Sequence, residues 1–391
     1  MLELMDETAV TASGRTLADL PTPALVLDRD RMDRNLARLA QRMERFGVTL
    51  RPHLKTAKSV DAARRIHPDG PGPITVSTLA EAEYFAREGG YTDITYAVGL
   101  DPTKAPRAVA LCLAGVDLKV VLDTPEQAAA LGEAARKGGA APSVLIEIDC
   151  DGHRGGLEPD HPGLVPLARA IEDAGLTLAG VLTHAGASYD LRDPEALADA
   201  AENERLAVVQ AAETLRAAGF ACPMVSVGST PTSHFARDLT GVTEVRAGVY
   251  MFFDLVMHGV GVCTTDDIAV SVLSTVIGHK PDKGWILVDA GWMAMSRDRG
   301  TASQPVDQGY GLVCDIDGVP FEDLIVDQAN QEHGILALRK GSTANRPDLP
   351  VGTRVRILPN HACATGAQHE AYNVVAGGDE VVAVWPRMRG W

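Results

Sequence analysis

The sequence predicts a (β/α)₈ barrel followed by a second, mostly antiparallel β domain, and two observations carry this prediction. Over residues 15–250, short β-branched runs alternate with longer amphipathic stretches rich in Ala, Leu, Glu and Arg. Such alternation is typical of βαβ units on a parallel sheet. After about residue 260, short strand-like runs are separated by Gly, Asp, Pro and Lys turns, as in antiparallel sheets. We therefore expect a barrel over 20–260 and a β domain over 261–391, which the N-terminal segment is free to join.

Nine runs in the first part are expected to be strands. They are Ala24–Leu27, Val48–His53, Ile74–Ser77, Asp93–Val98, Leu118–Leu122, Val144–Asp149, Leu178–Thr183, Met224–Val227 and Glu244–Tyr250. Nine exceed the eight strands of a closed barrel, so one of them, with the first as the candidate, is expected to belong elsewhere. An open doubly wound sheet is the alternative, but the number of strands favours closure.

Helices are expected between these runs. In the first of them, Arg29–Arg45, apolar residues recur at steps of three and four at Met32, Leu36, Leu39 and Met43, which marks one buried face. The other expected helices are Leu79–Glu88, Pro125–Lys137, Pro162–Ala174 and Pro194–Ala217. The strands expected in the second domain are Val270–Gly278, Trp285–Asp289, Ile335–Leu338, Arg354–Leu358 and Glu380–Trp385.

Composition narrows the class of protein. The chain has 391 residues, 46% of them hydrophobic, which is enough for a packed core and excludes wholesale disorder. Its 36 Lys and Arg against 52 Asp and Glu give a net charge of −16, which disfavours nucleic acid and membrane partners and favours small molecules. Residues 1–14 show no secretory signal, and the six cysteines stand singly, so we expect a cytoplasmic protein without disulfides.

Chemically active residues gather where the expected barrel strands end. Five segments share this position: RPHLKTAK at 51–58, DCDGHRGG at 149–156, THAGASY at 183–189, GSTPT at 228–232 and RAGVY at 246–250. Ligands of barrel enzymes bind at the carboxyl ends of the strands. Cations and imidazoles beside Gly, Ser and Thr loops suit an anionic, phosphate-bearing ligand there.

Lys55 is the candidate nucleophile of this group. A lysine amine can attack a carbonyl when desolvation or nearby cations lower its pKa, and Arg51 and His53 are close in sequence. The alternative is an ordinary solvated lysine. Likewise, Ser229 and Thr230 form either a phosphate cradle or an ordinary turn, and Arg154 is either a ligand contact or a salt-bridge partner.

The second domain contains a candidate metal site. His361 and Cys363 are separated by one residue and present an imidazole and a thiolate, both ligands of zinc and other divalent ions. The alternative is a buried cysteine beside an unrelated histidine. Glu332 and His333 offer another carboxylate and imidazole, or a polar turn.

Together these motifs resemble the fold-type III pyridoxal-phosphate enzymes, in the branch of D-serine dehydratase, D-threonine aldolase and D-threo-3-hydroxyaspartate dehydratase. The resemblance covers residues 20–391 and implies an alanine-racemase-like fold. It implies that Lys55, rather than Lys58, is the Schiff-base lysine, and that His361 and Cys363 bind a divalent metal, Zn, Mn or Mg. The further cofactor contacts that it implies are Arg154, His184, Tyr189, Ser229, Thr230, Gly248, Val249 and Tyr250.

Within the branch, segments 282–302, 329–336 and 361–368 are most similar to the dehydratases of D-threo-3-hydroxyaspartate. The resemblance implies a lyase that converts this substrate to oxaloacetate and ammonia. Two departures weaken a D-serine assignment: Ala364 stands where a proline is typical, and Leu182 where a second tyrosine is. For the second carboxylate of the substrate, Arg297 and Arg299 are the candidates, with His333 as a further substrate contact.

Three alternatives stay open. An aldolase acting on D-threonine or another 3-hydroxy amino acid, or a D-serine dehydratase, would use the same site. A non-catalytic pyridoxal-phosphate carrier shares the barrel but needs neither the β domain nor the His-Cys pair. The resemblance also implies a homodimer.

Overall fold

The computed structural model describes residues 14–391, which form two compact units. The barrel unit comprises residues 33–267 and 387–391. The β unit comprises residues 268–386 together with the described residues up to Met32. Within the described residues, no helix is both long and apolar enough to cross a membrane.

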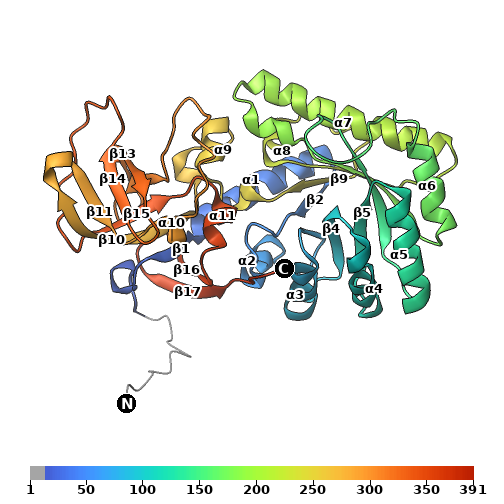
Figure 1. The fold of residues 1–391 in the computed structure, drawn as a ribbon, viewed down its shortest axis with the longest axis horizontal. Helices are drawn as coiled ribbons and strands as arrows, with labels where there is room; N and C mark the ends of the chain where they lie inside the picture. Colours follow the sequence, from blue (N-terminus) through green and yellow to red (C-terminus); the bar gives the residue numbers. More distant parts are fainter. Residues whose placement is uncertain (1–13) are drawn as a thin grey trace, which may run out of the picture. The chain divides into compact units, whose positions relative to one another are not determined.

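The barrel unit contains an eight-stranded parallel sheet in the order β2-β9-β8-β7-β6-β5-β4-β3 (Figure 1). Its strands are β2 (Thr49–Pro52), β3 (Ile74–Val76), β4 (Asp93–Gly99), β5 (Asp117–Leu122), β6 (Ser143–Ile148), β7 (Leu178–Thr183), β8 (Met224–Val227) and β9 (Glu244–Ala247). A single parallel bridge between His53 and Thr75 joins the two ends of the sheet. There the Leu54 N–H donates to the Thr75 carbonyl at 2.9 Å. The expected barrel is therefore confirmed.

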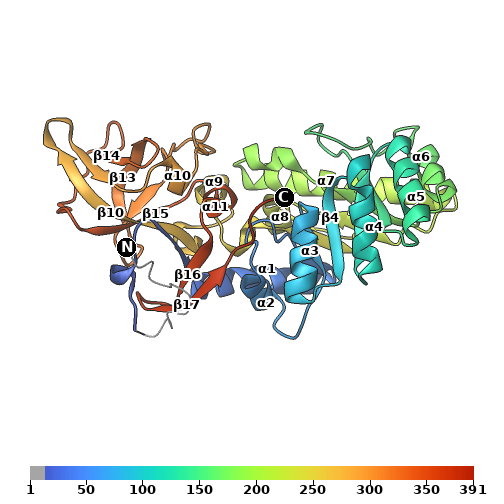
Figure 2. The ribbon, with the colours of Figure 1, turned by 60° about the horizontal axis from the view of Figure 1, so that its bottom comes forward.

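Helices cover the outside of this sheet, and in Figure 2 helices α3 to α6 stand side by side around it. The helices of the unit are α1 (Arg29–Phe46, which begins in the β unit), α2 (Val60–Ile66), α3 (Leu79–Gly89), α4 (Ala105–Leu113), α5 (Pro125–Gly138), α6 (Leu164–Asp173), α7 (Pro194–Ala217), α8 (Thr230–Phe235) and α9 (Leu255–Val260). Short 3₁₀ turns lie at Pro102–Lys104, Gly186–Asp190, Val249–Met251 and Thr265–Asp267. Side-chain caps begin several helices; for example, Thr124 and Gln127 form a capping box on α5.

The β unit contains a nine-stranded sheet in the order β11-β14-β13-β12-β15-β10-β1-β16-β17, and β11 also pairs with β10 (Figure 1). Its elements are β1 (Ala24–Asp28), β10 (Val270–Lys280), β11 (Trp285–Val288), β12 (Leu312–Cys314), β13 (Pro320–Ala329), β14 (Gly334–Leu338), β15 (Arg354–Leu358), β16 (Ala371–Val375), β17 (Val381–Pro386), α10 (Trp292–Met295) and α11 (Ala362–Gly366). Short 3₁₀ turns lie at Leu17–Asp19 and Pro281–Lys283. All pairings are antiparallel except that of β1 with β16, so the expected, mostly antiparallel domain is also confirmed.

The structure confirms one detail of the sequence prediction and differs from it in two others. The first expected strand is indeed outside the barrel, since β1 pairs with β10 and β16. The last expected barrel strand ends at Ala247 instead of Tyr250, because the backbone turns at Gly248 into a 3₁₀ helix. The last five residues belong to the barrel unit, where Met388 N–H donates to the Lys58 carbonyl at 2.7 Å.

Candidate active site

Lys55 lies in the turn that follows β2, at the carboxyl end of the barrel strands, and its side chain is exposed. Leu54 and Thr56 on either side are buried and anchor the turn. Lys58, three residues later, instead pairs with the buried carboxylate of Glu81 at 3.1 Å. The two lysines of the segment therefore differ, because of the two only Lys58 forms an ion pair.

Two imidazoles on this rim are held in the neutral form. Burial lowers the pKa of His184 to about 3, and the nearby charges of Arg154, Lys55 and Arg246 add to the shift. Burial, followed by the charges of Lys55 and Arg246, also places the pKa of His53 well below its ordinary value. Because the acceptor is the Gly228 carbonyl, Nδ1 of His184 is the donor of their hydrogen bond. The rim thus combines neutral imidazoles with cations that act on them at short range.

Arg246 was not predicted as a site residue, although it begins the predicted segment 246–250. It lies on β9 and is 4% exposed, and its guanidinium donates to the Ser226 hydroxyl and to the Thr183 carbonyl. Burial lowers the pKa of Arg246 to about 10, which Glu244, Glu204 and Glu147 oppose, so the guanidinium remains charged at neutral pH. The only sequence signal is two charges, Glu244 and Arg246, at alternate positions of a short strand, which puts both on the same face.

A ladder of ion pairs inside the barrel supports Arg246 from below. Lys119 pairs with Asp93 at 2.7 Å, and Asp93 pairs with Arg51 at 2.8 Å. Arg51 in turn contacts Glu244 at 2.7 Å, and Glu244 accepts a hydrogen bond from Ser226 at 2.6 Å. The Ser226 hydroxyl also accepts a hydrogen bond from Arg246, so it connects the ladder to Arg246.

A buried carboxylate joins the loops that follow β7 and β8. Glu204 on α7 is 2% exposed and accepts hydrogen bonds from the backbone N–H groups of Ala185 and Gly228, at 3.0 and 2.9 Å. Its second oxygen accepts one from the Thr232 hydroxyl at 2.7 Å. Ser229 caps α8 and lies 2.9 Å from the Ser188 hydroxyl, measured between their Oγ atoms. Glu204 was not identified from the sequence, because nothing in a long helix marks one glutamate as the buried one.

A buried hydroxyl without a partner and two closely packed glycines lie at these loops. Thr230 Oγ1 is buried and has no hydrogen-bond partner among the described residues. Gly228 has a φ of +157°, and a Cβ there would lie 1.9 Å from the Arg246 carbonyl oxygen. A Cβ on Gly248 would lie 3.0 Å from Thr56 Oγ1 and 3.1 Å from the His53 carbonyl oxygen. Glycine at position 228 therefore allows β8 and β9 to approach each other this closely, and Gly248 packs tightly against the Lys55 turn.

The remaining predicted cofactor contacts lie on the same rim, with one qualification. The ring of Tyr189 is 6.2 Å from that of His184, and Arg154 is half exposed with its guanidinium 3.9 Å from Glu147. Val249 follows Gly248 in the 3₁₀ turn. The side chain of Tyr250, however, lines a separate cavity of about 460 Å³ with residues of α1 and β2, so only its backbone is placed beside Gly248.

In the β unit, His361 and Cys363 lie at the start of α11. His361 Nδ1 is 2.7 Å from a carboxylate oxygen of Asp298, a residue for which no role was predicted. The hydrogen bond from His361 is the largest cause of a lowered pKa at Asp298. Within residues 14–391, no three His, Cys, Asp or Glu side chains gather in a metal-binding arrangement, so water or substrate would have to complete the shell of a metal held here.

Two sets of hydrogen bonds hold the segments of this site together. The Asn360 amide donates to the carbonyls of Asp298 and Gly309, at 3.0 and 2.7 Å. The Thr365 hydroxyl and the His369 ring donate to the last carbonyls of α10, at 2.7 and 2.8 Å. His361 and Asp298 are 63 residues apart in sequence, so spacing alone could not have paired them.

The predicted substrate residues also lie in the β unit. The Arg297 guanidinium stacks on the Trp292 ring, with 4.4 Å from the guanidinium carbon to the ring centroid. Arg299 pairs with Asp307 at 2.8 Å and stacks on Tyr310. His333 is exposed in the turn between β13 and β14. Of the two arginines, Arg299 already has a carboxylate partner.

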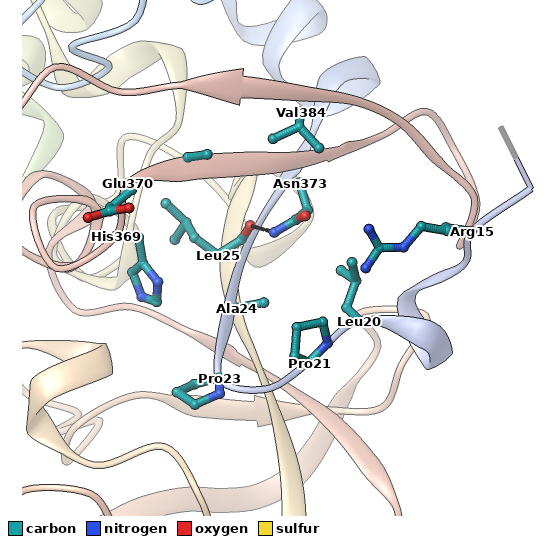
Figure 3. A pocket seen from close by; sticks show the side chains of 11 residues that line it. Arg15, Leu20, Pro21, Pro23, Ala24, Leu25, His369, Glu370, Asn373 and Val384 are labelled. Carbon is teal, nitrogen blue, oxygen red and sulfur yellow. Dashed lines mark hydrogen bonds between the residues drawn. The ribbon is translucent and has the colours of Figure 1, made fainter. Parts of the chain in front are cut away.

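A cavity of about 530 Å³ opens elsewhere in the β unit, beside β1 and β16 (Figure 3). Arg15, His369 and Glu370 contribute charged or polar groups to its wall. The Asn373 amide, drawn in Figure 3, donates to the Leu25 carbonyl at 3.2 Å and joins the two strands. None of the predicted catalytic, cofactor or metal residues lines this cavity.

The rim of the barrel fits pyridoxal phosphate. An exposed amine, charged guanidinium groups and the unpartnered Thr230 hydroxyl are what an aldehyde and a phosphate require. The donor set of His361 and Cys363 fits a divalent ion in the same way. The barrel unit and the β unit make up an alanine-racemase-like fold, which alanine racemase of Clostridium difficile 630 shares with a TM-score of 0.66 at 16% identity.

Comparisons with known proteins define the family. Residues 27–256 match the N-terminal domain of alanine racemase, and residues 269–375 match a putative serine dehydratase domain. The chain therefore belongs to the pyridoxal-phosphate-dependent lyases of the D-serine dehydratase and D-threonine aldolase branch, fold type III. It is 56% identical to D-threo-3-hydroxyaspartate dehydratase of Delftia sp. (strain HT23), over 96% of this chain and 99% of that enzyme.

Two further relatives bear on the reaction. The solved structure of the Delftia enzyme matches with a TM-score of 0.93, covering 96% of this chain and 100% of that one. Two other solved structures are of a D-threo-3-hydroxyaspartate dehydratase, as a histidine-to-alanine variant and as a cysteine-to-alanine variant in a metal-free form. 3-Hydroxy-D-aspartate aldolase of Paracoccus denitrificans (strain Pd 1222) is 30% identical, over 95% of this chain and 93% of that enzyme.

Proposed function

We propose that this chain is a dehydratase of D-threo-3-hydroxyaspartate that depends on pyridoxal phosphate and a divalent metal. The reaction breaks the Cα–H and Cβ–O bonds and eliminates water, and the resulting enamine tautomerises and is hydrolysed. The net products are oxaloacetate and ammonia, because the water that is lost is regained in the hydrolysis. The observation that carries the proposal is 56% identity, over nearly the whole of both chains, to an enzyme of that name.

Lys55 is proposed to hold the cofactor and to act as the base. When bound, pyridoxal phosphate supplies an electron sink that makes the α-proton of an amino acid removable. Lys55 is suited to take that proton, because its amine is exposed on a turn fixed by the buried Leu54 and Thr56. Lys58 is not suited to the task, because Glu81 holds its amine.

The other rim residues are proposed to bind and orient the cofactor. Ser229, Thr230 and the backbone of Gly248, Val249 and Tyr250 offer donors for a phosphate. The neutral ring of His184, with Tyr189 beside it, presents an uncharged face for stacking. Arg154 and Arg246 add positive charge for the cofactor ring and its oxygens.

His361 and Cys363 are proposed to hold the metal. A divalent ion supplies Lewis-acid stabilisation to a departing hydroxide, which is otherwise a poor leaving group. Two findings support these ligands. The histidine and cysteine replaced in the solved dehydratase variants are two positions apart, like His361 and Cys363, and the cysteine variant is in a metal-free form. The hydrogen bond from Nδ1 to Asp298 leaves Nε2 of His361 as the nitrogen for the ion.

An aldolase reaction is the second candidate, and the 30% identity to 3-hydroxy-D-aspartate aldolase favours it. It would use the same groups but break the Cα–Cβ bond and release glycine and an aldehyde. The homodimer and the cytoplasmic location expected from the sequence remain proposals of the same kind.

A substrate panel tests the proposal. Values of kcat/KM are measured for D-threo-3-hydroxyaspartate, D-serine and D-threonine, with pyridoxal phosphate and in turn Zn²⁺, Mn²⁺ or Mg²⁺. We expect 3-hydroxyaspartate to be the best substrate by at least about tenfold, since a second carboxylate paired with a cation contributes more than about 1.4 kcal/mol. Equal or faster turnover of D-serine would overturn the substrate assignment.

A further inference from the structure

We infer that Asp298 fixes the tautomer of His361 that puts the lone pair on Nε2, the nitrogen proposed to bind a metal ion, and that it must be a carboxylate to do so. This inference deepens the proposed function and rests on the metal site proposed there. It makes Asp298 a positioning residue, since it acts through His361. Neither the motifs of the sequence nor the names of the related proteins assign it a role.

Both oxygens of Asp298 are occupied. One accepts a hydrogen bond from the Gly300 backbone N–H at 2.7 Å. The other is 2.7 Å from Nδ1 of His361. The side chain therefore has to accept hydrogen bonds at both of its terminal atoms, which a carboxylate does and an amide does not.

The position of Asp298 is set by its surroundings. Its backbone N–H donates to the Ser296 hydroxyl at 3.2 Å, and its carbonyl accepts from Asn360, the residue directly before His361. Asn360 is itself 2% exposed and accepts a hydrogen bond from the Thr301 hydroxyl at 3.1 Å. Asp298 and His361 are thus tied together through backbone as well as side chain.

This geometry determines which nitrogen of His361 carries the proton. A neutral imidazole has one N–H, and a carboxylate 2.7 Å from Nδ1 places it there. The lone pair is then on Nε2, the form that ligates a metal. A carboxylate at this position also increases the basicity of the ligating nitrogen, and removing such a partner typically weakens metal binding by about 10- to 100-fold.

Two variants of Asp298 should differ in metal affinity in the order opposite to their similarity to aspartate. In Asp298→Asn, the Gly300 N–H needs an acceptor, so the amide oxygen turns toward it and the amide NH₂ faces His361. Nδ1 must then accept, and the proton moves to Nε2, where it blocks the metal. In Asp298→Ala, His361 is free to take either tautomer. We therefore expect the nearly isosteric Asn variant to bind metal no better than the Ala variant, and at least about tenfold more weakly than wild type.

The test is a Zn²⁺ dissociation constant for the full-length protein, measured by competition with a chromophoric chelator. Wild type is compared with Asp298→Asn, Asp298→Ala and His361→Ala, and with Asp327→Asn as a matched control on an exposed aspartate of the same unit. If Asp298 had only a structural role, Asp298→Asn would weaken Zn²⁺ binding less than Asp298→Ala. Wild-type affinity in Asp298→Asn, or an Asn variant clearly tighter than the Ala variant, would overturn the inference.

A second measurement reads the tautomer directly, without metal. ¹⁵N NMR of the histidine rings at mildly alkaline pH should show His361 protonated at Nδ1 in wild type and at Nε2 in Asp298→Asn. A wild-type His361 protonated at Nε2 refutes the inference even where the variants do not fold. If wild type shows the Nδ1–H tautomer but binds no Zn²⁺, the tautomer assignment holds and the proposed metal site fails.

Discussion

At the scale of single residues, the partners of each side chain distinguish candidates that look alike in sequence. Lys55 and Lys58 are three positions apart in one polar segment, but Lys58 is held by Glu81 and Lys55 is exposed at the strand ends. Arg297 and Arg299 differ in the same way, since Arg299 pairs with Asp307 and Arg297 rests on an aromatic ring. Each pair yields a prediction.

Replacing Lys55 by alanine should abolish turnover, because the substitution removes both the attachment point of the cofactor and the base. We expect kcat to fall by at least about 10³-fold and the visible absorption band of the protein-bound cofactor to shift or disappear. Lys137→Ala is the control, since Lys137 is an exposed lysine paired only with Glu133. Turnover retained in Lys55→Ala at more than about a tenth of wild type would remove Lys55 from the mechanism.

Replacing Arg297 by alanine should raise KM for D-threo-3-hydroxyaspartate by about tenfold or more, because it removes a cation that has no carboxylate partner among the described residues. Arg299→Ala should change KM less, because the Arg299 guanidinium is already paired with Asp307. Steady-state kinetics of the two variants check this. Wild-type KM values in both would eliminate the arginines as the carboxylate site.

Some residues of the site could be found from the sequence and others could not. Some predicted residues lie in short segments in which a few neighbouring residues already indicate the chemistry. They are Lys55, His184, Ser229, His361 and Cys363. Glu204 and Asp298 contact partners 24 and 63 residues away, and such contacts leave no local pattern. Arg246 was within reach, because two charges, Glu244 and Arg246, on one face of a short strand need partners or a ligand there.

At the scale of elements, the loops after β7 and β8 depend on α7. Glu204 is in the middle of that helix, and it accepts hydrogen bonds from both loops and from the first turn of α8. Because its two backbone donors are buried, they have no water to replace it. A helix on the outside of the barrel thereby sets the shape of the loops that are proposed to hold the phosphate.

Replacing Glu204 by alanine should leave two buried N–H groups unpaired, at about 1–3 kcal/mol each in the free energy of unfolding, and should weaken binding of pyridoxal phosphate. Glu204→Gln is the matched variant, because its amide oxygen can still accept both N–H groups. Chemical denaturation and cofactor titration check both effects. If the two variants lost stability and cofactor affinity equally, the hydrogen bonds would not be what Glu204 supplies.

The strands of the barrel unit were predicted better from the sequence than the strands of the β unit. Barrel strands were found because each is a short apolar run between amphipathic helices. Three strands of the β unit, β12, β13 and β16, were not expected. β13 carries Glu322, Asp323 and Asp327 in ten residues and is buried only over Leu324–Val326, so it lacks a continuous apolar run.

At the scale of the whole molecule, charge is distributed unevenly. The chain carries a net charge of −16, yet Lys55, Arg154 and Arg246 act together on the imidazoles of one rim. The same concentration of cations, with burial, keeps His53 and His184 neutral, and burial keeps the pKa of His234 at about 4. These histidines make the stability of the barrel depend on pH.

The direction in which stability changes with pH follows from the lowered pKa values of these histidines. Between the ordinary histidine pKa near 6.5 and the folded value, the unfolded chain binds more protons than the native one, so stability falls as the pH falls. Each such histidine should lower the free energy of unfolding of the protein by about 1.4 kcal/mol when the pH falls from about 7.5 to about 5.5. His234→Gln, outside the proposed site, should reduce the pH dependence by that amount in chemical denaturation. An unchanged dependence would mean that His234 is not kept neutral.

The central claim is that this chain eliminates water from a 3-hydroxy amino acid instead of splitting its carbon chain. The most direct test is to incubate the holoenzyme with D-threo-3-hydroxyaspartate and to quantify ammonia, oxaloacetate, glycine and glyoxylate. We expect ammonia and oxaloacetate in equal amounts, with no glycine above that formed by a Lys55→Ala control. Glycine and glyoxylate in equal amounts, without ammonia, would show that the Cα–Cβ bond is broken and would make the chain an aldolase.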